Sequence, residues 1–314
     1  MGDPVLLCDL SIGSHVNLAL AEAGQRPEDA AQYECTGRDA LDGAILDFLK
    51  RKDNPRLKGA AISSRGWEDG GIIHLPDGNL TISRTELREL LDVQRVNLVN
   101  NFVARALAIP SLRRNERSKI CGGDNAEETV IAVLGPHYGL GLAALVADGA
   151  GGWTALPGEG GHSDLPVKTD RQWAVMKSLK ARHGHVSREM TVSLSGLCEV
   201  WRAIGVIDGA DPQGADAQTI VNMARRGDAR AQEAVSLVTD WLAGMASDVA
   251  MIMGARGGIY LTGALLDMVG DMFDAHRFCA GYLDKGALSD YVRDIPVFRT
   301  TARQMEITGL STLF

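Results

Sequence analysis

The chain has 314 residues, a formal net charge of −8, 45% hydrophobic residues and 23% charged residues. This length exceeds one compact core and predicts two domains, and the composition is that of a globular protein. No basic stripe is present, which argues against nucleic-acid binding, and the five cysteines, an odd number without a CxxC pair, argue against a disulfide framework or a zinc site.

The start of the chain and its hydropathy pattern bear on its location. Met1-Gly2-Asp3-Pro4 lacks the basic and apolar regions of a signal peptide. No apolar run reaches the ~18 residues that a membrane span needs. We therefore expect a cytoplasmic protein without membrane attachment.

The first part of the chain is predicted to open with a β-hairpin. Residues 5–10 read as a buried strand, 11–14 as a turn, and 15–21 as a second strand with alternating polarity. A capping box, Ser83 with Glu86, predicts the start of a helix. The further elements expected here are strands at 58–63 and 96–99, helices at 39–50 and 83–91, and a helix that ends before Pro110.

The second part begins after the polar stretch 113–128 and repeats the same opening. Residues 129–134 are predicted as a strand, 135–141 as a glycine-containing turn, and 142–147 as the returning strand. Apolar residues three and four apart make 228–253 a long core-facing helix. The other expected elements are helices at 171–182, 197–204 and 265–273, and strands at 258–263 and 295–298.

Two units with the same opening predict two related α/β domains and a cleft between them that binds the ligand. We expect a small domain over 1–110, joined by the tail from about 298–314, and a large domain over 111–297.

One glycine-rich segment, Leu156-Pro157-Gly158-Glu159-Gly160-Gly161-His162-Ser163-Asp164, carries chemistry. It predicts a loop that holds a carboxylate and an imidazole three residues apart. Sugar hydroxyls need both hydrogen-bond donors and acceptors, and glycines let the backbone approach a ligand closely. The alternative is a surface turn with incidental polar residues.

The chain resembles bacterial glucokinases, of the actin-like, hexokinase-like ATPase superfamily, nearly from end to end. The resemblance is carried by Asp9, Val99-Asn100-Asn101-Phe102, Ala108-Ile109-Pro110, Gly139-Leu140-Gly141, Pro157-Gly158-Glu159-Gly160-Gly161-His162, Gly184-His185-Val186-Ser187 with Glu189, and Asp294-Ile295-Pro296-Val297. It implies two α/β domains of the ribonuclease H-like, actin-like ATPase fold, and a homodimer.

The resemblance also implies binding sites for a hexose, most simply glucose, and for Mg-ATP. The residues at the family's sugar-binding positions are Asn100, Asn101, Glu159, His162 and Glu189. The residues at its nucleotide-binding positions are Asp9, Ser11, Gly13, Gly135, Tyr138, Gly139, Gly141 and Gly263. Asp9 matches the family residue that helps to hold Mg²⁺ through water.

This sequence departs from the family pattern at the catalytic base. Glucokinases have an aspartate that takes the proton from the attacking sugar hydroxyl, and Asn101 stands at this position. An amide keeps the shape and can bind a hydroxyl, but it cannot take up a proton near pH 7. Loss of a positioned base typically costs ~10²–10⁴ in rate.

The nucleotide side departs as well. Ile12 replaces a glycine of the first phosphate loop, and His137-Tyr138 replaces a small Gly-Thr pair in the second, where a tyrosine has room to fill the space of a terminal phosphate. Leu194 and Ala264 each stand in place of a family glycine. These changes make ATP binding doubtful.

The sequence therefore favours a glucokinase-like protein that keeps its hexose site and has lost most phosphoryl transfer. Three alternatives remain. One is an active ATP-dependent hexose kinase, because phosphoryl transfer depends mainly on positioning and electrostatics. The others are a protein that binds a different ligand in the same cleft, and a non-catalytic sensor or subunit.

Overall fold

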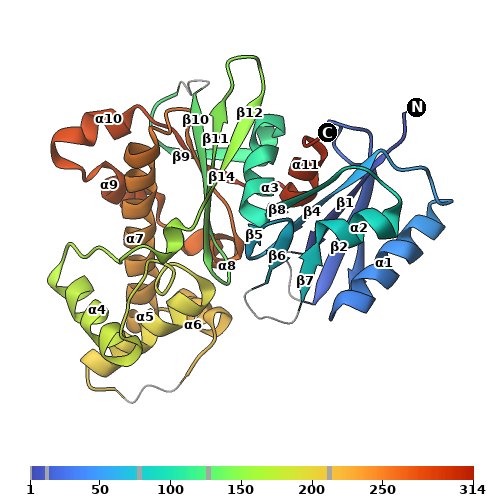
Figure 1. The fold of residues 1–314 in the computed structure, drawn as a ribbon. Helices are drawn as coiled ribbons and strands as arrows, with labels where there is room; N and C mark the ends of the chain where they lie inside the picture. The colour runs from blue at the N-terminus through green and yellow to red at the C-terminus, as the bar shows by residue number, and fades with distance from the viewer. Residues whose placement is uncertain (1, 11–13, 76–79, 125–128, 211–213) are drawn as a thin grey trace. The chain divides into compact units, whose positions relative to one another are not determined.

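The computed structural model describes residues 2–10, 14–75, 80–124, 129–210 and 214–314 (Figure 1). Its contacts divide the chain into two compact units. Unit 1 comprises Met1–Arg113 and Ala302–Phe314, and unit 2 comprises Arg114–Thr301.

Unit 1 is built on a five-stranded sheet in the order β3-β2-β1-β4-β8. Its first three strands in the chain are antiparallel, and β1, β4 and β8 run parallel. The strands are β1 (Val5–Leu10), β2 (His15–Ala21), β3 (Ala31–Glu34), β4 (Gly59–Ser64) and β8 (Val96–Asn100). A second, antiparallel sheet holds β5 (Trp67–Asp69), β6 (Ile72–His74) and β7 (Thr81–Ser83).

Helices cover both faces of the larger sheet in unit 1, because alternate residues of its strands point to opposite faces. One set of β1 residues packs under α1 and α2, and the other set packs under α3 and α11. These helices are α1 (Arg38–Arg51), α2 (Arg84–Leu91), α3 (Asn101–Ala108) and α11 (Met305–Ser311).

The C-terminal helix α11 belongs to unit 1 and packs closely on α3. A Cβ atom at Gly309 would lie 1.7 Å from the carbonyl oxygen of Ala104, so only glycine permits this approach. Arg105 Nε donates to Glu306 Oε1 at 2.6 Å, and both side chains are largely buried.

Unit 2 is built on a six-stranded sheet in the order β12-β11-β10-β13-β14-β9. Strand β10 lies between an antiparallel and a parallel neighbour, as β1 does in unit 1. The strands are β9 (Arg117–Cys121), β10 (Val130–Pro136), β11 (Leu140–Ala147), β12 (Trp153–Gly158), β13 (Ile259–Leu261) and β14 (Val297–Thr300). The repeated opening predicted from the sequence is therefore confirmed.

Helix α7 (Ala229–Met253) is the central helix of unit 2, as the orange helix of Figure 1 shows. Its apolar stripe is buried among α5, α6 and α9. The other helices are α4 (Asp170–His183), α5 (Leu194–Ile207), α6 (Ala217–Arg225), α8 (Ala264–Val269), α9 (Ala275–Leu283) and α10 (Ser289–Arg293). Short 3-10 turns occur at Ile109–Ser111, Arg114–Glu116, Gly160–His162, Gly270–Met272 and Gly286–Leu288.

By length and composition, α7 is also apolar enough to cross a membrane, although no apolar run of sufficient length was expected from the sequence. In that helix, 72% of the apolar window is buried inside the protein. This burial is typical of a core helix.

Candidate functional site

Asn100 and Asn101 stand where β8 ends and α3 begins, in unit 1. Asn100 is the N-cap residue of α3: its Oδ1 accepts from the backbone N–H of Phe102 at 2.8 Å, and its Nδ2 donates to the carbonyl oxygen of Gly66 at 2.8 Å. Both ends of this amide therefore have backbone partners.

Asn101 has a different environment, although it is the next residue. It is the first residue of α3 and only 8% exposed. Its side-chain amide has no hydrogen-bond partner among the residues that the structure describes. An amide in this position can donate to a ligand hydroxyl and accept from one.

Asp9 lies one residue before the end of β1 and is 2% exposed. Ser63, its neighbour in register on β4, donates its hydroxyl to Asp9 Oδ1 at 2.8 Å. A buried carboxylate is costly unless it is paired or hydrogen-bonded, so its retention here points to a specific task. The carboxyl ends of the parallel strands β1, β4 and β8 meet at this edge, the usual location of ligands in such sheets. Ser11 and Gly13, expected beside Asp9, lie outside the described residues.

The segment around Glu159 differs from the predicted loop. Residues 156–158 belong to β12, and 160–162 form a 3-10 turn directly after Glu159. Gly161 allows this turn to lie against β11, because a Cβ atom there would sit 2.1 Å from the carbonyl oxygen of Leu140.

Backbone hydrogen bonds bring the segment of Glu159 and His162 to the loop of Glu189. Arg188 N donates to Ser163 O at 3.0 Å, and Glu189 N donates to Gly161 O at 2.8 Å. As a result, His162 Nε2 lies 4.0 Å from Glu189 Oε2. Glu159 and His162 are exposed, and the Glu189 side chain is partly exposed. Unit 2 therefore gathers two carboxylates and an imidazole at one surface, a set able to bind several hydroxyls.

Glu189 is held by the turn between β10 and β11. Its Oε2 accepts from the backbone N–H of Leu140 at 2.8 Å. The preceding residue, Gly139, leaves room for this carboxylate: a Cβ atom there would lie 2.4 Å from the same oxygen and would displace it. Gly139 is thus part of the turn and also gives the Glu189 carboxylate space to reach the Leu140 N–H.

The β10–β11 turn is shorter than the predicted turn over 135–141. Gly135 and Gly141 are cross-strand partners, so only residues 137–139 form the turn. Tyr138 is 64% exposed, and its ring centroid lies 4.8 Å from that of His137.

The start of α5 contacts this turn through carbonyl oxygens of the turn. His137 O accepts from Leu194 N at 2.8 Å, and Tyr138 O accepts from the Ser195 hydroxyl at 3.3 Å. Gly263, with φ of +121°, packs against the end of β10, where a Cβ atom would meet Pro136 O at 2.3 Å. The residues of unit 2 that the resemblance predicts for nucleotide binding therefore lie together: Gly135, Tyr138, Gly139, Gly141 and Gly263.

Metal binding has one candidate residue, Asp9. Among the described residues, no group of three His, Cys, Asp or Glu side chains is placed to hold a metal ion. Magnesium in nucleotide sites is usually held by one or two carboxylates, by waters and by the phosphates themselves. A single carboxylate such as Asp9 fits that mode.

Sequence reasoning missed the residues that support the candidate ligands. Ser63 donates a hydrogen bond to Asp9. Arg188, the residue before Glu189, makes an ion pair with Asp248 of α7. The Ser64 hydroxyl, at the end of β4, is buried without a hydrogen-bond partner among the described residues. No pattern of residue types marks them, because each depends on contacts between distant segments.

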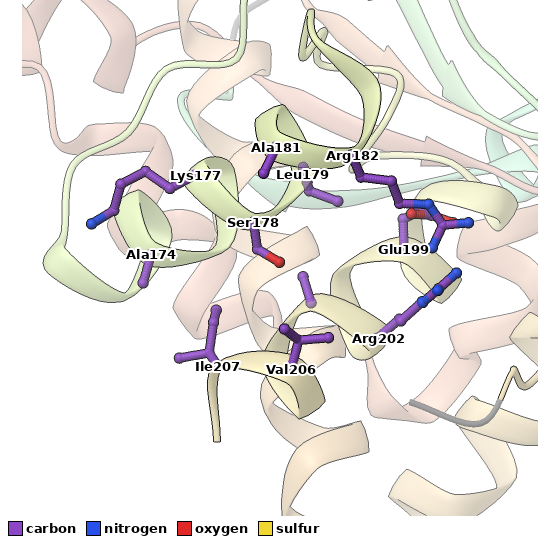
Figure 2. Close-up of a pocket in the computed structure, with 11 residues that line it drawn as sticks. Ala174, Lys177, Ser178, Leu179, Ala181, Arg182, Glu199, Arg202, Val206 and Ile207 are labelled. Atoms are coloured by element: carbon purple, nitrogen blue, oxygen red, sulfur yellow. The ribbon is translucent and has the colours of Figure 1, made fainter. Parts of the chain in front are cut away.

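A pocket lies away from these residues, between α4 and α5, with a volume of about 720 Å³ (Figure 2). Leu179 of α4 and Val206 of α5 line it from opposite sides, and Lys177, Arg182 and Arg202 add positively charged side chains to its lining. Arg182 approaches Glu199 at 3.6 Å. None of the residues expected from the sequence lines this pocket.

Comparison with known proteins agrees with the resemblance seen in the sequence. The sequence model of the glucokinase family matches residues 6–314. A glucokinase-like protein of Caulobacter vibrioides is 35% identical over 303 residues, with 96% of this chain and 94% of that protein covered. A glucokinase of Chromobacterium violaceum is 34% identical over 309 residues, with 98% and 88% covered.

A solved structure has the same fold. The crystal structure of a glucokinase from an Antarctic psychrotroph matches with a TM-score of 0.88 and 27% identity, over 100% of this chain and 99% of that one. The predicted fold class, an α/β protein with the two-domain actin-like ATPase fold, is confirmed. The chain belongs to the glucokinase family.

Proposed function

We propose that this protein binds a hexose, glucose in the simplest case, and has lost most of the ATP-dependent phosphoryl transfer of its family. The groups proposed to bind its hydroxyls are Asn100 and Asn101 of unit 1, and Glu159, His162 and Glu189 of unit 2. The observation that carries the loss is Asn101, a buried amide at the family's base position.

The chemistry follows from the protonation of these groups. Glu159 and Glu189, as carboxylates, accept hydrogen bonds from hydroxyls, and His162 can accept or donate. Asn101 can orient the hydroxyl that would attack the phosphoryl group, but it cannot remove its proton. The hydroxyl proton then goes to water, and turnover falls by about 10²–10⁴ if nothing else replaces the base.

The proposal includes a residue for magnesium, Asp9, but only weak binding of ATP. Magnesium, held through water by Asp9 and directly by the nucleotide, would neutralise charge on the phosphoryl group. Tyr138 and Ile12 stand where the family has small residues, which supports weak ATP binding.

A second candidate is an active hexose kinase, and two observations favour it. The relative from Chromobacterium violaceum is named a glucokinase, and Asp9 is buried and hydrogen-bonded to Ser63, as a retained functional carboxylate would be. Phosphoryl transfer relies largely on positioning, so turnover without the base is chemically possible. A homodimer, as the family resemblance implies, is compatible with either function.

Calorimetry separates the two candidates. Glucose and ATP are titrated separately into the protein with Mg²⁺ present, and ADP release is followed with both present. We expect saturable glucose binding, weak or no ATP binding and ADP release near background. Binding of both with glucose-dependent ADP release establishes the kinase, and no saturable hexose binding rules out the proposed function.

A further inference from the structure

Arg188 precedes Glu189 in the loop and is paired inside unit 2. Its guanidinium lies 2.8 Å from Asp248 Oδ2, and the other oxygen of this carboxylate accepts from Lys285 Nζ. The three side chains are only 14%, 21% and 12% exposed. We call Arg188, Asp248 and Lys285 the Asp248 triad.

The triad joins the loop of Glu189 to the central helix. Asp248 lies on α7, and Lys285 follows α9. Arg188 also binds the neighbouring segment, because its backbone N–H donates to Ser163 O at 3.0 Å and its Nε donates to Asp164 O at 3.4 Å. One side chain therefore contacts the segment that follows His162 and, through Asp248, the core of unit 2.

The charges within the triad balance only while Arg188 and Lys285 both stay close to Asp248. Two cations share one carboxylate in a largely buried place, so loss of that carboxylate leaves two like charges with reduced solvation. Such groups stabilise a fold little compared with apolar packing, but they fix orientation strongly. No candidate hydroxyl-binding side chain belongs to the triad, so any effect that it has on the site passes through the orientation of the loop.

We infer that Asp248, acting through Arg188, is a positioning residue that sets Glu189 and the 159–164 segment for hydroxyl binding. This inference rests on the proposed hexose site. The positioned bond is also visible without a sugar, because Glu189 Oε2 accepts from the backbone N–H of Leu140.

The test uses Asp248→Asn with a matched control on the same helix. Asp240→Asn removes a carboxylate of α7 that binds Arg277 through both oxygens, at 2.7 and 2.6 Å. Each variant is measured for glucose affinity by calorimetry and for hydrogen exchange at the Leu140 amide. Arg188→Lys is a milder variant, because it keeps the charge next to Asp248 and gives up the planar fork.

We expect Asp248→Asn to weaken glucose binding by about tenfold to a hundredfold, the scale of small misplacements in a binding site. Its Leu140 amide should exchange faster, while Asp240→Asn changes neither quantity. Arg188→Lys should fall between wild type and Asp248→Asn in both measurements.

The outcomes separate this inference from the proposed function. If wild type binds glucose but Asp248→Asn binds equally well with unchanged Leu140 exchange, the positioning role is overturned and the hexose site stands. If wild type does not bind glucose, the hexose site fails. In that case, faster exchange of the Leu140 amide in Asp248→Asn, but not in Asp240→Asn, still supports the positioning of Glu189. Equal changes in Asp240→Asn would reduce the triad to general stability and overturn the inference.

Discussion

Asn100 and Asn101 show how two adjacent residues of one type take different tasks. The amide of Asn100 holds the first turn of α3 and the carbonyl group of Gly66. The amide of Asn101 has no partner in the described part of the chain and is left for a ligand. Substitution of Asn100 should therefore lower stability as well as hydroxyl binding, whereas substitution of Asn101 should act mainly on the chemistry.

Asn101→Asp restores a proton acceptor without a change of size. Where ATP binds at all, we expect glucose-dependent ADP release to rise by roughly 10²-fold, the lower end of the usual contribution of a general base. A coupled enzyme assay with Mg-ATP measures it. Asn101→Ala, which removes the amide and adds no base, is the control and should give no increase. An unchanged rate in Asn101→Asp would place the main defect on the nucleotide side.

Gly161 and Gly158 are a second pair of identical residues, and they differ in the space available for a side chain. A Cβ atom at 161 would clash with a backbone oxygen at 2.1 Å, whereas at 158 the nearest atom lies 3.6 Å away. We expect Gly161→Ala to cost about 1–3 kcal/mol in unfolding free energy and to weaken glucose binding, because the turn of His162 must shift. Gly158→Ala should be tolerated. Urea unfolding and calorimetry compare the two, and equal effects would contradict the close approach to Leu140.

Residue types and spacing were enough to identify Glu159 and His162 as candidates. They were not enough to identify the bond between Glu189 and the N–H of Leu140, because those residues are 49 positions apart. Such a contact depends on how the β10–β11 turn packs on the loop, and no local pattern encodes it. The Asp248 triad escaped prediction for the same reason.

At the scale of elements, the cap of α5 is the part most closely connected to the candidate site. The Ser193 hydroxyl is fully buried, accepts from Gly196 N at 2.9 Å and donates to Glu189 O at 2.8 Å. The hydroxyl thus starts the helix through one hydrogen bond and holds the backbone of Glu189 through the other.

Ser193→Ala should therefore lower the unfolding free energy by about 1–2 kcal/mol. Ser83→Ala is the comparison, since Ser83 caps α2 with a longer bond of 3.4 Å at an exposed position, and should cost about 0.5 kcal/mol. Chemical unfolding measures both variants. A larger loss at Ser83 would show that burial of the cap does not determine its contribution.

Strong periodicity made the long elements predictable and left the short ones hidden. The helix expected over 228–253 is α7, and the first hairpin is β1 with β2. Strands β3, β9 and β12 were missed, because none of them contains a run of buried apolar residues. Edge strands such as these owe their conformation to pairing with a neighbour, which is a tertiary effect.

At the scale of the whole molecule, carboxylates with lowered pKa values predict how stability depends on pH. Hydrogen bonds from Arg171 lower the pKa of Asp208, and the backbone N–H of Thr219 lowers that of Asp216. Each contributes stability that is present above the unfolded pKa, about 3.9, and is lost as pH falls through the lower folded value.

We therefore expect unfolding to become easier as pH falls below about 4, the window set by these lowered pKa values. Asp208→Asn should flatten that dependence, and Arg171→Met, which removes the cause, should flatten it in the same way. Thermal unfolding between pH 3 and 6 measures the slopes. A wild-type slope that is retained in both variants would show that other groups control acid unfolding.

The position of α11 has a consequence for the order of events during synthesis. Ile307 and Leu310 close an apolar core with Val5 and Leu7 of β1, which is synthesised about 300 residues before them. Every residue of unit 2 is translated before that core can be completed. Until then, this face of the nascent β1 has only α3 to cover it, while the whole of unit 2 is synthesised. The last step in the folding of unit 1 therefore follows the synthesis of unit 2.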